Sequence, residues 1–143
     1  MTMKQTGLDT IDHAPQVVAE WLNLLEVDLG WHDRSRSYRL LRETLHAIRD
    51  FLTVPEAAAL SAQLPLLLRG IFFEGWMPAR TPARPRSADA LLARVGKAFA
   101  DDPLLEPDVA IAAVFAVLRR RIDPGEYEQV ARSLRRPIRE MWM

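Results

Sequence analysis

The stretch LTVPEAAALSAQLPLLLRGIFFEGW, residues 52–76, returns in altered form as IDPGEYEQVARSLRRPIREMW at residues 122–142, an offset of 70 positions. At this offset residues 17–72 align with 87–142 without a gap, and the large apolar positions coincide. The identical pairs include Arg49, Glu56, Leu64 and Arg69, which meet Arg119, Glu126, Leu134 and Arg139. This self-similarity predicts two units of one design, packed about an approximate two-fold axis that buries both apolar faces.

Apolar residues recur at helical spacing within each unit, which predicts an all-α fold: two pseudo-symmetric repeats of about four helices, packed into one helical bundle. We expect one compact domain of four parts. They are a flexible tail at 1–16, the first repeat at 17–76, a Pro/Arg linker at 77–86 and the second repeat at 87–143.

Two helix starts carry the spacing of a capping box. Thr53 is followed by Glu56 and Asp123 by Glu126, each with a proline between them. In this motif the first side chain accepts a free backbone N–H while the glutamate reaches back to the N–H of the cap residue. Proline suits the first turn because the N–H that it lacks would have no helical partner. Both sites are therefore predicted to start a helix.

Residues 64–73, LPLLLRGIFF, form the most apolar segment, in which Arg69 is the only charged residue. A helix that is apolar nearly all round must be covered on every side. We expect this helix at the centre of the core, buried by its neighbours or by another subunit.

Length and composition fit one soluble globular domain, with 143 residues of which 49% are hydrophobic and 27% charged. The chain has no cysteine, which excludes disulfides, thiolate catalysis and iron–sulfur clusters. It has neither a secretory signal nor an apolar run long enough to cross a membrane, so we expect a cytoplasmic protein. Residues 1–76 carry 7 basic and 10 acidic side chains, and residues 77–143 carry 12 and 9. These opposed charges favour either docking of one half on the other or head-to-tail self-association.

The two half-patterns, YRLLRETLHAIRDFLTVPEAAALSAQLPLLLRGIF and VAIAAVFAVLRRRIDPGEYEQVARSLRRPIREMW, resemble the duplicated helical units of the bacterial family called domain of unknown function 2267. The resemblance runs from about residue 17 to the end. The first unit keeps the Leu-Pro and Leu-Arg ending of the family, whereas in the second the proline has moved to Pro137. The resemblance implies an all-helical fold and a bacterial cytoplasmic setting, and it transfers no catalytic residue.

The part of the first unit that the second lacks is the candidate site. It comprises an aromatic cluster at the end of the apolar helix and the basic linker beyond it. Aromatic side chains anchor partners or line pockets for apolar ligands, although core packing is the commoner use. The candidate binding residues are Phe72, Phe73, Trp76, Met77, Arg80 and Arg84.

Other chemistry is weakly indicated. Three histidines match no zinc spacing, the acidic run at residues 101–108 lacks the calcium-loop pattern, and no catalytic signature occurs. We therefore assign no catalytic residue, metal or cofactor. The many arginines of residues 119–139 and the linker suit phosphates or an acidic protein, but zero net charge favours a solvated basic face over a nucleic-acid site.

Three hypotheses follow, in order of preference. The first is a non-enzymatic protein-interaction or regulatory module, which associates with itself or another protein. The alternative is a binder of small apolar ligands, with its pocket between the repeats near Trp76. The third is an enzyme, which would need a polar cleft where carboxylates converge with His46. The sequence predicts neither a nucleic-acid partner nor a membrane partner.

Overall fold

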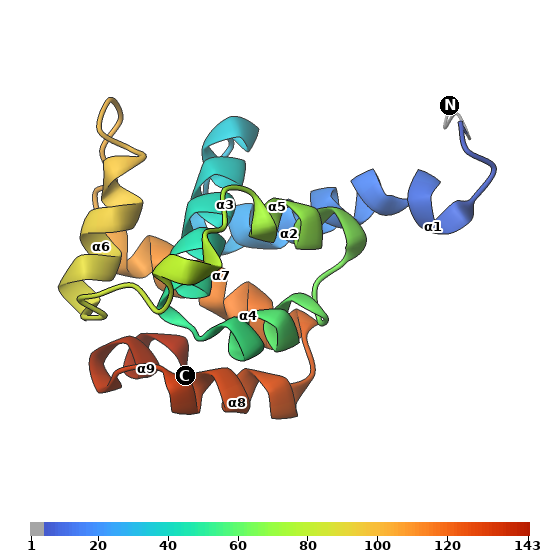
Figure 1. Ribbon diagram of the computed structural model, residues 1–143. Helices are drawn as coiled ribbons and strands as arrows, with labels where there is room; N and C mark the ends of the chain where they lie inside the picture. Colours follow the sequence, from blue (N-terminus) through green and yellow to red (C-terminus); the bar gives the residue numbers. More distant parts are fainter. Residues whose placement is uncertain (1–4) are drawn as a thin grey trace.

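The computed structural model describes residues 5–143, and every regular element in that range is helical (Figure 1). In chain order they are α1 (Asp9–Asp12), α2 (Ala14–Leu29), α3 (Arg34–Phe51), α4 (Val54–Ser61), α5 (Leu66–Phe73), the 3₁₀ turn η1 (Pro78–Arg80), α6 (Ala88–Lys97), α7 (Pro107–Arg121), α8 (Pro124–Ser133) and α9 (Arg136–Trp142). The prediction of an all-α bundle is confirmed.

Local signals set the ends of several helices. Gly30 ends α2 in the left-handed conformation at φ 68°, which a glycine adopts without a steric penalty. The Asp33 side chain accepts from the Arg36 N–H at 3.1 Å at the start of α3. Ser87 likewise caps α6 by accepting from the Ala90 N–H at 3.1 Å. Each cap satisfies a backbone donor that has no partner inside the helix.

Only one of the two predicted capping boxes is complete. In α4 the Glu56 N–H donates to Thr53 Oγ1 at 3.3 Å, and the Thr53 N–H donates to Glu56 Oε1 at 2.8 Å. In α8 Asp123 accepts from the Glu126 N–H at 3.1 Å, but the Asp123 N–H donates to Gln63 Oε1 at 3.2 Å. The prediction of a second box is therefore wrong, because Gln63 of the other half occupies the place that Glu126 would take.

The core lies between α3 and α7, which contact each other near the middle of the bundle (Figure 1). Both have long buried faces, with Leu40, Leu45, Ile111 and Phe115 fully buried. The expectation that residues 64–73 form the centre of the core is wrong. Helix α5 packs on α2 and α3 through one face only, which buries Leu68 and Phe72.

Several helix contacts, some between the two halves and some within each half, form corresponding pairs. Helix α2 packs on α7 and α6 packs on α3, while α5 packs on α3 and α9 packs on α7. Helices α4 and α8 contact each other directly. In Figure 1 α4 and α8 lie one above the other. Exchanging α2 with α6, α3 with α7, α4 with α8 and α5 with α9 leaves this set of contacts unchanged.

An arm, residues 7–20, extends from the body of the molecule (Figure 1). It contains α1 and the first part of α2, and it corresponds to most of the tail expected at residues 1–16. Residues 9–12 and 14–16 are helical, so the described part of this segment is regular rather than irregular. Residues 1–4 of the expected tail lie outside the described residues.

The linker, residues 77–86, forms η1 and then follows an irregular path along the C-terminal end of α3. The Ala83 N–H donates to the Asp50 carbonyl at 2.6 Å, and Arg86 donates to the Phe51 carbonyl at 3.4 Å. These bonds use carbonyls of the last turn of α3, which have no helical partner. The linker is thereby attached to the body instead of lying free.

Candidate functional site

The aromatic cluster is divided between core and surface. Phe72 is 0% exposed and packs edge-on against Phe73, with ring centroids 5.2 Å apart. Phe73 contacts Trp76 at 4.9 Å, and both are partly buried. The Trp76 Nε1–H is buried without a hydrogen-bond acceptor among the described residues. Phe72 therefore serves the core in this conformation, while Trp76 keeps an unused donor.

Met77 and Arg80 lie on the rim of a small cavity of about 250 Å³. Met77 is 53% exposed, and the cavity also contacts Asp50 and Arg94. Burial alone would raise the pKa of Asp50, but hydrogen bonds from Arg49 at 2.8 Å and ion pairing with Arg94 at 2.5 Å outweigh it and lower this pKa. Asp50 is thus held as a paired carboxylate, and it is not poised to donate a proton.

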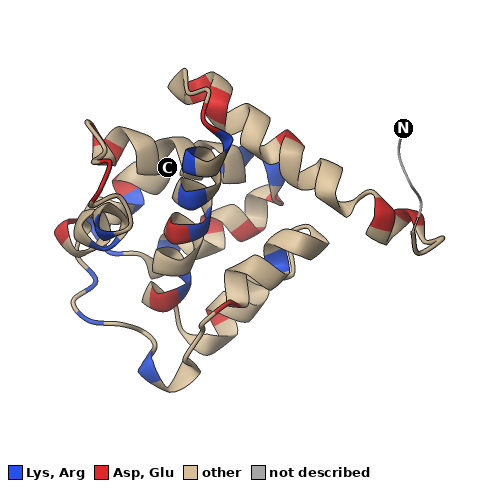
Figure 2. Ribbon diagram, turned by 90° about the horizontal axis from the view of Figure 1, so that it is seen from above, with Lys and Arg blue, Asp and Glu red and all other residues tan. Residues whose placement is uncertain are grey.

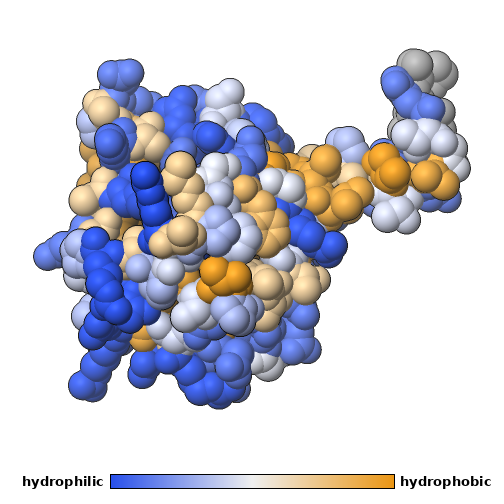
Figure 3. All heavy atoms as spheres, viewed as in Figure 1, coloured by the Kyte–Doolittle hydropathy of each residue, from blue (hydrophilic) through white to orange (hydrophobic). Residues whose placement is uncertain are grey.

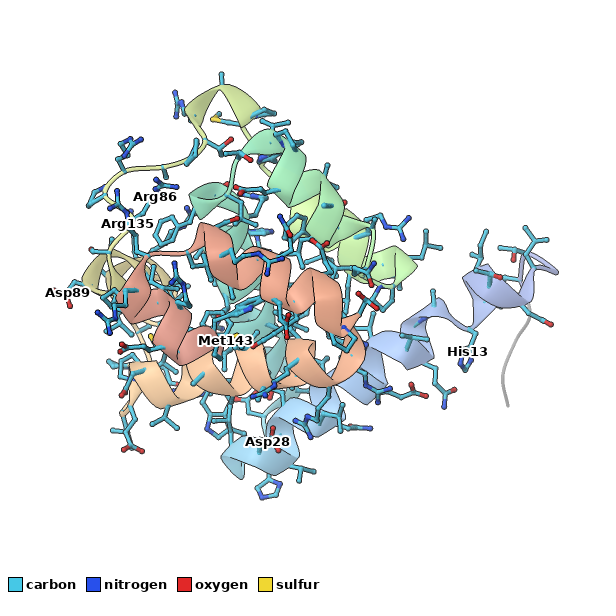
Figure 4. The ribbon with its side chains drawn as sticks, turned by 90° about the horizontal axis from the view of Figure 1, so that it is seen from below. His13, Asp28, Arg86, Asp89, Arg135 and Met143 are labelled. Carbon is cyan, nitrogen blue, oxygen red and sulfur yellow. The ribbon has the colours of Figure 1, made fainter. Side chains whose placement is uncertain are left out.

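Arg84 lies elsewhere, at a larger open cleft of about 690 Å³. We call this the basic cleft; its residues are Arg84, Pro85, Arg86, Ser87, Arg135 and Pro137. It joins the end of the linker to the connection between α8 and α9. Figure 4 shows the side chains of Arg86 and Arg135 close together at this place. The structure therefore separates Arg84 from Met77 and Arg80, with which the sequence had grouped it.

Most arginines of residues 119–139 have partners within the chain. Arg120 pairs with Asp28 at 2.5 Å and Arg119 donates to the Met143 carbonyl at 2.9 Å. Arg139 donates to the carbonyls of Ala131 and Leu134, both at 2.9 Å. These contacts fit the predicted reading of a basic face that is paired and solvated. Among the described residues Arg135, like Arg121, forms neither an ion pair nor a side-chain hydrogen bond.

His46 is buried in α3 and is 7% exposed. Its Nε2 lies 2.7 Å from the Ile71 carbonyl oxygen, to which it donates. Burial lowers the pKa of His46, with the Arg49 charge acting in the same direction against the effect of the Ile71 contact. A neutral, buried imidazole with this bond joins α3 to α5. Among residues 5–143 no group of three or more His, Asp or Glu side chains is arranged to hold a metal ion.

A second surface feature is apolar. On α5, Leu66 is 48% exposed and Leu67 is 41% exposed. On the arm, Leu8 and Ile11 are exposed and Val17 and Val18 are partly buried. Figure 3 shows hydrophobic residues running along the arm to the place where α2 meets α5. We call this the apolar arm surface; its residues are Leu8, Ile11, Val17, Val18, Leu66 and Leu67.

The arm is also acidic. Its charged residues, within 7–20, are Asp9, Asp12 and Glu20, with no Lys or Arg. Figure 2 shows acidic residues on α1 and α2, and basic residues along the linker. The sequence did not group Leu66 with the arm, nor Arg135 with Ser87, because both groupings depend on tertiary packing. The high apolar content of residues 64–73 was the sequence signal that could have indicated the grouping of Leu66 with the arm.

Comparison with protein families gives one match. A model of the family described as Uncharacterized conserved protein (DUF2267) matches residues 18–141, which is most of the chain. No curated protein matches the chain. Among the described residues no helix is both long and apolar enough to cross a bilayer.

Proposed function

The chain belongs to the DUF2267 family of uncharacterised conserved proteins, and we propose that it is a non-enzymatic protein-interaction module that associates with a second copy of itself. The apolar arm surface is the contact site in this proposal. The single observation that carries it is the exposure of Leu66 and Leu67 on α5, the most apolar helix of the chain.

Exposure of these leucines has an energetic meaning. Covering a leucine side chain fully contributes about 1.5–3 kcal/mol relative to leaving it in water. The neighbours of α5 in the chain cover Leu68 and Phe72 but leave the adjacent Leu66 and Leu67 half exposed. Contiguous apolar surface of this kind is typical of contact sites. A protein partner that covers Leu66 and Leu67 removes this apolar surface from water, which stabilises the complex.

Charge favours a second copy as the partner. The arm carries only acidic charges, while residues 77–143 carry 12 basic and 9 acidic side chains. The arm of one molecule and the basic half of another therefore attract each other, which steers their approach. The apolar residues supply the short-range contact that holds the pair together.

We also propose that the bundle consists of two units related by an approximate two-fold axis. Contacts between α4 and α8 support this proposal, because the chain after each helix contacts the start of the other helix. Gln63, after α4, accepts from the Asp123 N–H, and Ser133, at the end of α8, donates to Glu56 at the start of α4. At the offset of 70 positions Gln63 corresponds to Ser133. Such reciprocity is the mark of a two-fold contact.

The bends before α5 and α9 support the same proposal. Arg69 donates to the carbonyls of Ser61 and Leu64, both at 3.1 Å. Arg139, 70 positions later, donates to the carbonyls of Ala131 and Leu134, both at 2.9 Å. Each carbonyl of the second set also lies 70 positions after its counterpart in the first. One arginine therefore closes each bend in the same way.

Sedimentation equilibrium tests the self-association. We expect the wild-type chain to form dimers or larger species as its concentration rises, and the double variant Leu66→Glu/Leu67→Glu to remain monomeric. Leu105→Glu is the matched control, since Leu105 is 97% exposed and lies outside the apolar arm surface. A wild type that is monomeric over the whole range, or a control that dissociates as well, would overturn the proposal.

A second candidate function is the binding of a small ligand near Trp76, and the unused Trp76 Nε1–H is the observation that favours it. The nearby cavity contacts Asp50, Arg80 and Arg94, so its border suits a polar group better than a purely apolar ligand. Native mass spectrometry of the purified protein tests this candidate. The absence of a co-purified mass, together with unchanged tryptophan fluorescence across a metabolite library, would remove it.

A further inference from the structure

We propose that the basic cleft is a binding site for a small phosphate-bearing anion, independent of the apolar arm surface. The cleft brings the guanidinium groups of Arg84, Arg86 and Arg135 to one place. No carboxylate of residues 5–143 forms an ion pair with any of the three. The nearest acid that the electrostatics identify is Glu56, whose pKa the Arg86 charge helps to lower although the two form no ion pair. The like charges in the cleft repel one another, and an anion between them relieves that repulsion.

Arg86 adds an observation that points to a ligand. Its Nε–H is buried and has no hydrogen-bond acceptor among the described residues, although one terminal nitrogen donates to the Phe51 carbonyl at 3.4 Å. A buried donor without an acceptor is costly. The bond to Phe51 holds the guanidinium against the end of α3, while Arg86 also lines the cleft.

The start of α6 contributes to the same cleft. Ser87 accepts from the Ala90 N–H at 3.1 Å, which leaves the hydroxyl hydrogen of Ser87 free to donate to an anion. The first N–H groups of this ten-residue helix carry partial positive charge. Asp89, in the first turn of α6, is exposed and is the acidic residue nearest in sequence. Figure 4 shows it at the edge of the molecule, apart from Arg86.

The proposed repeat offers an independent comparison. At the offset of 70 positions Val17 and Val18 correspond to Ser87 and Ala88, and Leu66 and Leu67 correspond to Arg136 and Pro137. The junction of α6 with α9 is thus the counterpart of the junction of α2 with α5. The junction of α2 with α5 is apolar, whereas the junction of α6 with α9 is basic. Two equivalent places have acquired different chemistry, as expected if they bind different partners.

The shape and donors of the cleft define the ligand class. Guanidinium groups present paired N–H donors that match the oxygens of a phosphate. Three such groups suit a phosphate dianion better than a single carboxylate. The cleft is open, and Pro85 and Pro137 form apolar borders beside the arginines. A phosphate monoester can therefore place its phosphate on Arg86 and Arg135 while its remaining group extends outward.

Titration of the full chain with inorganic phosphate and with phenyl phosphate tests the site. Heteronuclear NMR at constant ionic strength should show saturable shifts of the Ser87 and Ala88 amide signals and of the Arg86 Nε–H signal. Constant ionic strength matters because salt screens exposed charges. Shifts that stay linear, or that spread over all surface arginines, would overturn the proposal.

Variants sharpen the test. Arg84 and Arg135 are exposed, so Arg84→Gln and Arg135→Gln should fold normally, which circular dichroism verifies. We expect Arg135→Gln to weaken phosphate binding about ten-fold or more, as for loss of a charge-assisted contact. The matched control is Arg121→Gln, an exposed arginine at the end of α7 outside the cleft. Equal binding by wild type and Arg135→Gln would refute the site.

Two further experiments distinguish phosphate binding from self-association and from the binding of an acidic protein segment. Leu66→Glu/Leu67→Glu should bind phosphate like the wild type, so loss of self-association and loss of phosphate binding are distinguishable. A hexa-aspartate peptide is the competitor of a different class. If this peptide binds the cleft more tightly than phenyl phosphate does, the site recognises an acidic protein segment and the proposal of a small phosphate ligand is overturned.

Discussion

Glu56→Ala and Glu126→Ala form a matched pair, because the two glutamates occupy the same position of the two proposed units. Glu56 Oε1 accepts from the Thr53 N–H at 2.8 Å, and Glu56 Oε2 accepts from the Ser133 hydroxyl. Each of these hydrogen bonds contributes about 0.5–1.5 kcal/mol net, so Glu56→Ala should lower the free energy of unfolding by about 1–3 kcal/mol. Glu126 accepts no hydrogen bond from the described residues. Its replacement should change the free energy of unfolding by less than about 0.5 kcal/mol.

The two carboxyl groups should also respond oppositely to pH. Burial raises the pKa of Glu56, but hydrogen bonds from Ser133 and Thr53 outweigh it and lower that pKa. The stabilisation by Glu56 is thus present at neutral pH and is lost as the pH falls through the lowered folded-state pKa. Burial, with the Asp123 charge, raises the pKa of Glu126. Whatever Glu126 contributes is present at low pH and is lost as the pH rises through its raised pKa.

Urea unfolding followed by circular dichroism at pH 7 and near pH 3.5 measures both effects. We expect a clear loss for Glu56→Ala at pH 7, which shrinks at the lower pH, and little change for Glu126→Ala at either. Equal losses for the two variants at pH 7 would refute the reasoning, since they would mean that the complete box and the Ser133 contact contribute nothing beyond helix propensity.

Three other substitutions test the packing. In the same unfolding assay Leu68→Ala should lower the free energy of unfolding by about 2–5 kcal/mol, and Leu66→Ala by less than about 0.5 kcal/mol. The reason is that the fold buries Leu68 but leaves Leu66 half exposed. Similar losses for the two variants would contradict the placement of α5. Arg49→Met should cost about 3–5 kcal/mol, because the buried guanidinium donates to the Phe72 and Glu74 carbonyls and pairs with Asp50; calorimetry showing an unchanged melting temperature would argue against this role. Tyr127→Phe should lower the free energy of unfolding by about 1–3 kcal/mol, since the hydroxyl donates to backbone carbonyls at Phe115 and Trp142. Burial raises the pKa of Tyr127, so a spectroscopic titration should show this residue ionising at a higher pH than an ordinary tyrosine.

The features that were predictable from the sequence are those set by local chemistry. The cap residues Asp33, Thr53 and Ser87 and the left-handed Gly30 each act within one helical turn, so their residue types alone locate the helix ends. The spacing of apolar residues gave the helices between them. The second capping box failed, because Gln63, in the connection between α4 and α5, accepts the Asp123 N–H from 60 positions away in the chain.

The candidate site was less accessible to the same reasoning, because it depends on which helices meet. An apolar run such as residues 64–73 indicates burial but does not specify what covers it, and the fold covers only the face with Leu68 and Phe72. The sequence placed the linker arginines together with those of residues 119–139, but it did not indicate that Arg84 and Arg86 meet Arg135 at one cleft. The opposed charges of the two halves follow from the sequence. The projecting arm that carries part of the acidic charge does not.

Hydrogen–deuterium exchange measured at low and at high protein concentration tests self-association through the apolar arm surface, because it reports both association and its location. We expect amides of residues 8–19 and 64–73 to exchange more slowly at high concentration, together with amides of a second patch within residues 77–143. Amides of α7, which lies in the core, should not change. Exchange that is independent of concentration throughout the chain, or protection that omits α5, would contradict self-association through the apolar arm surface.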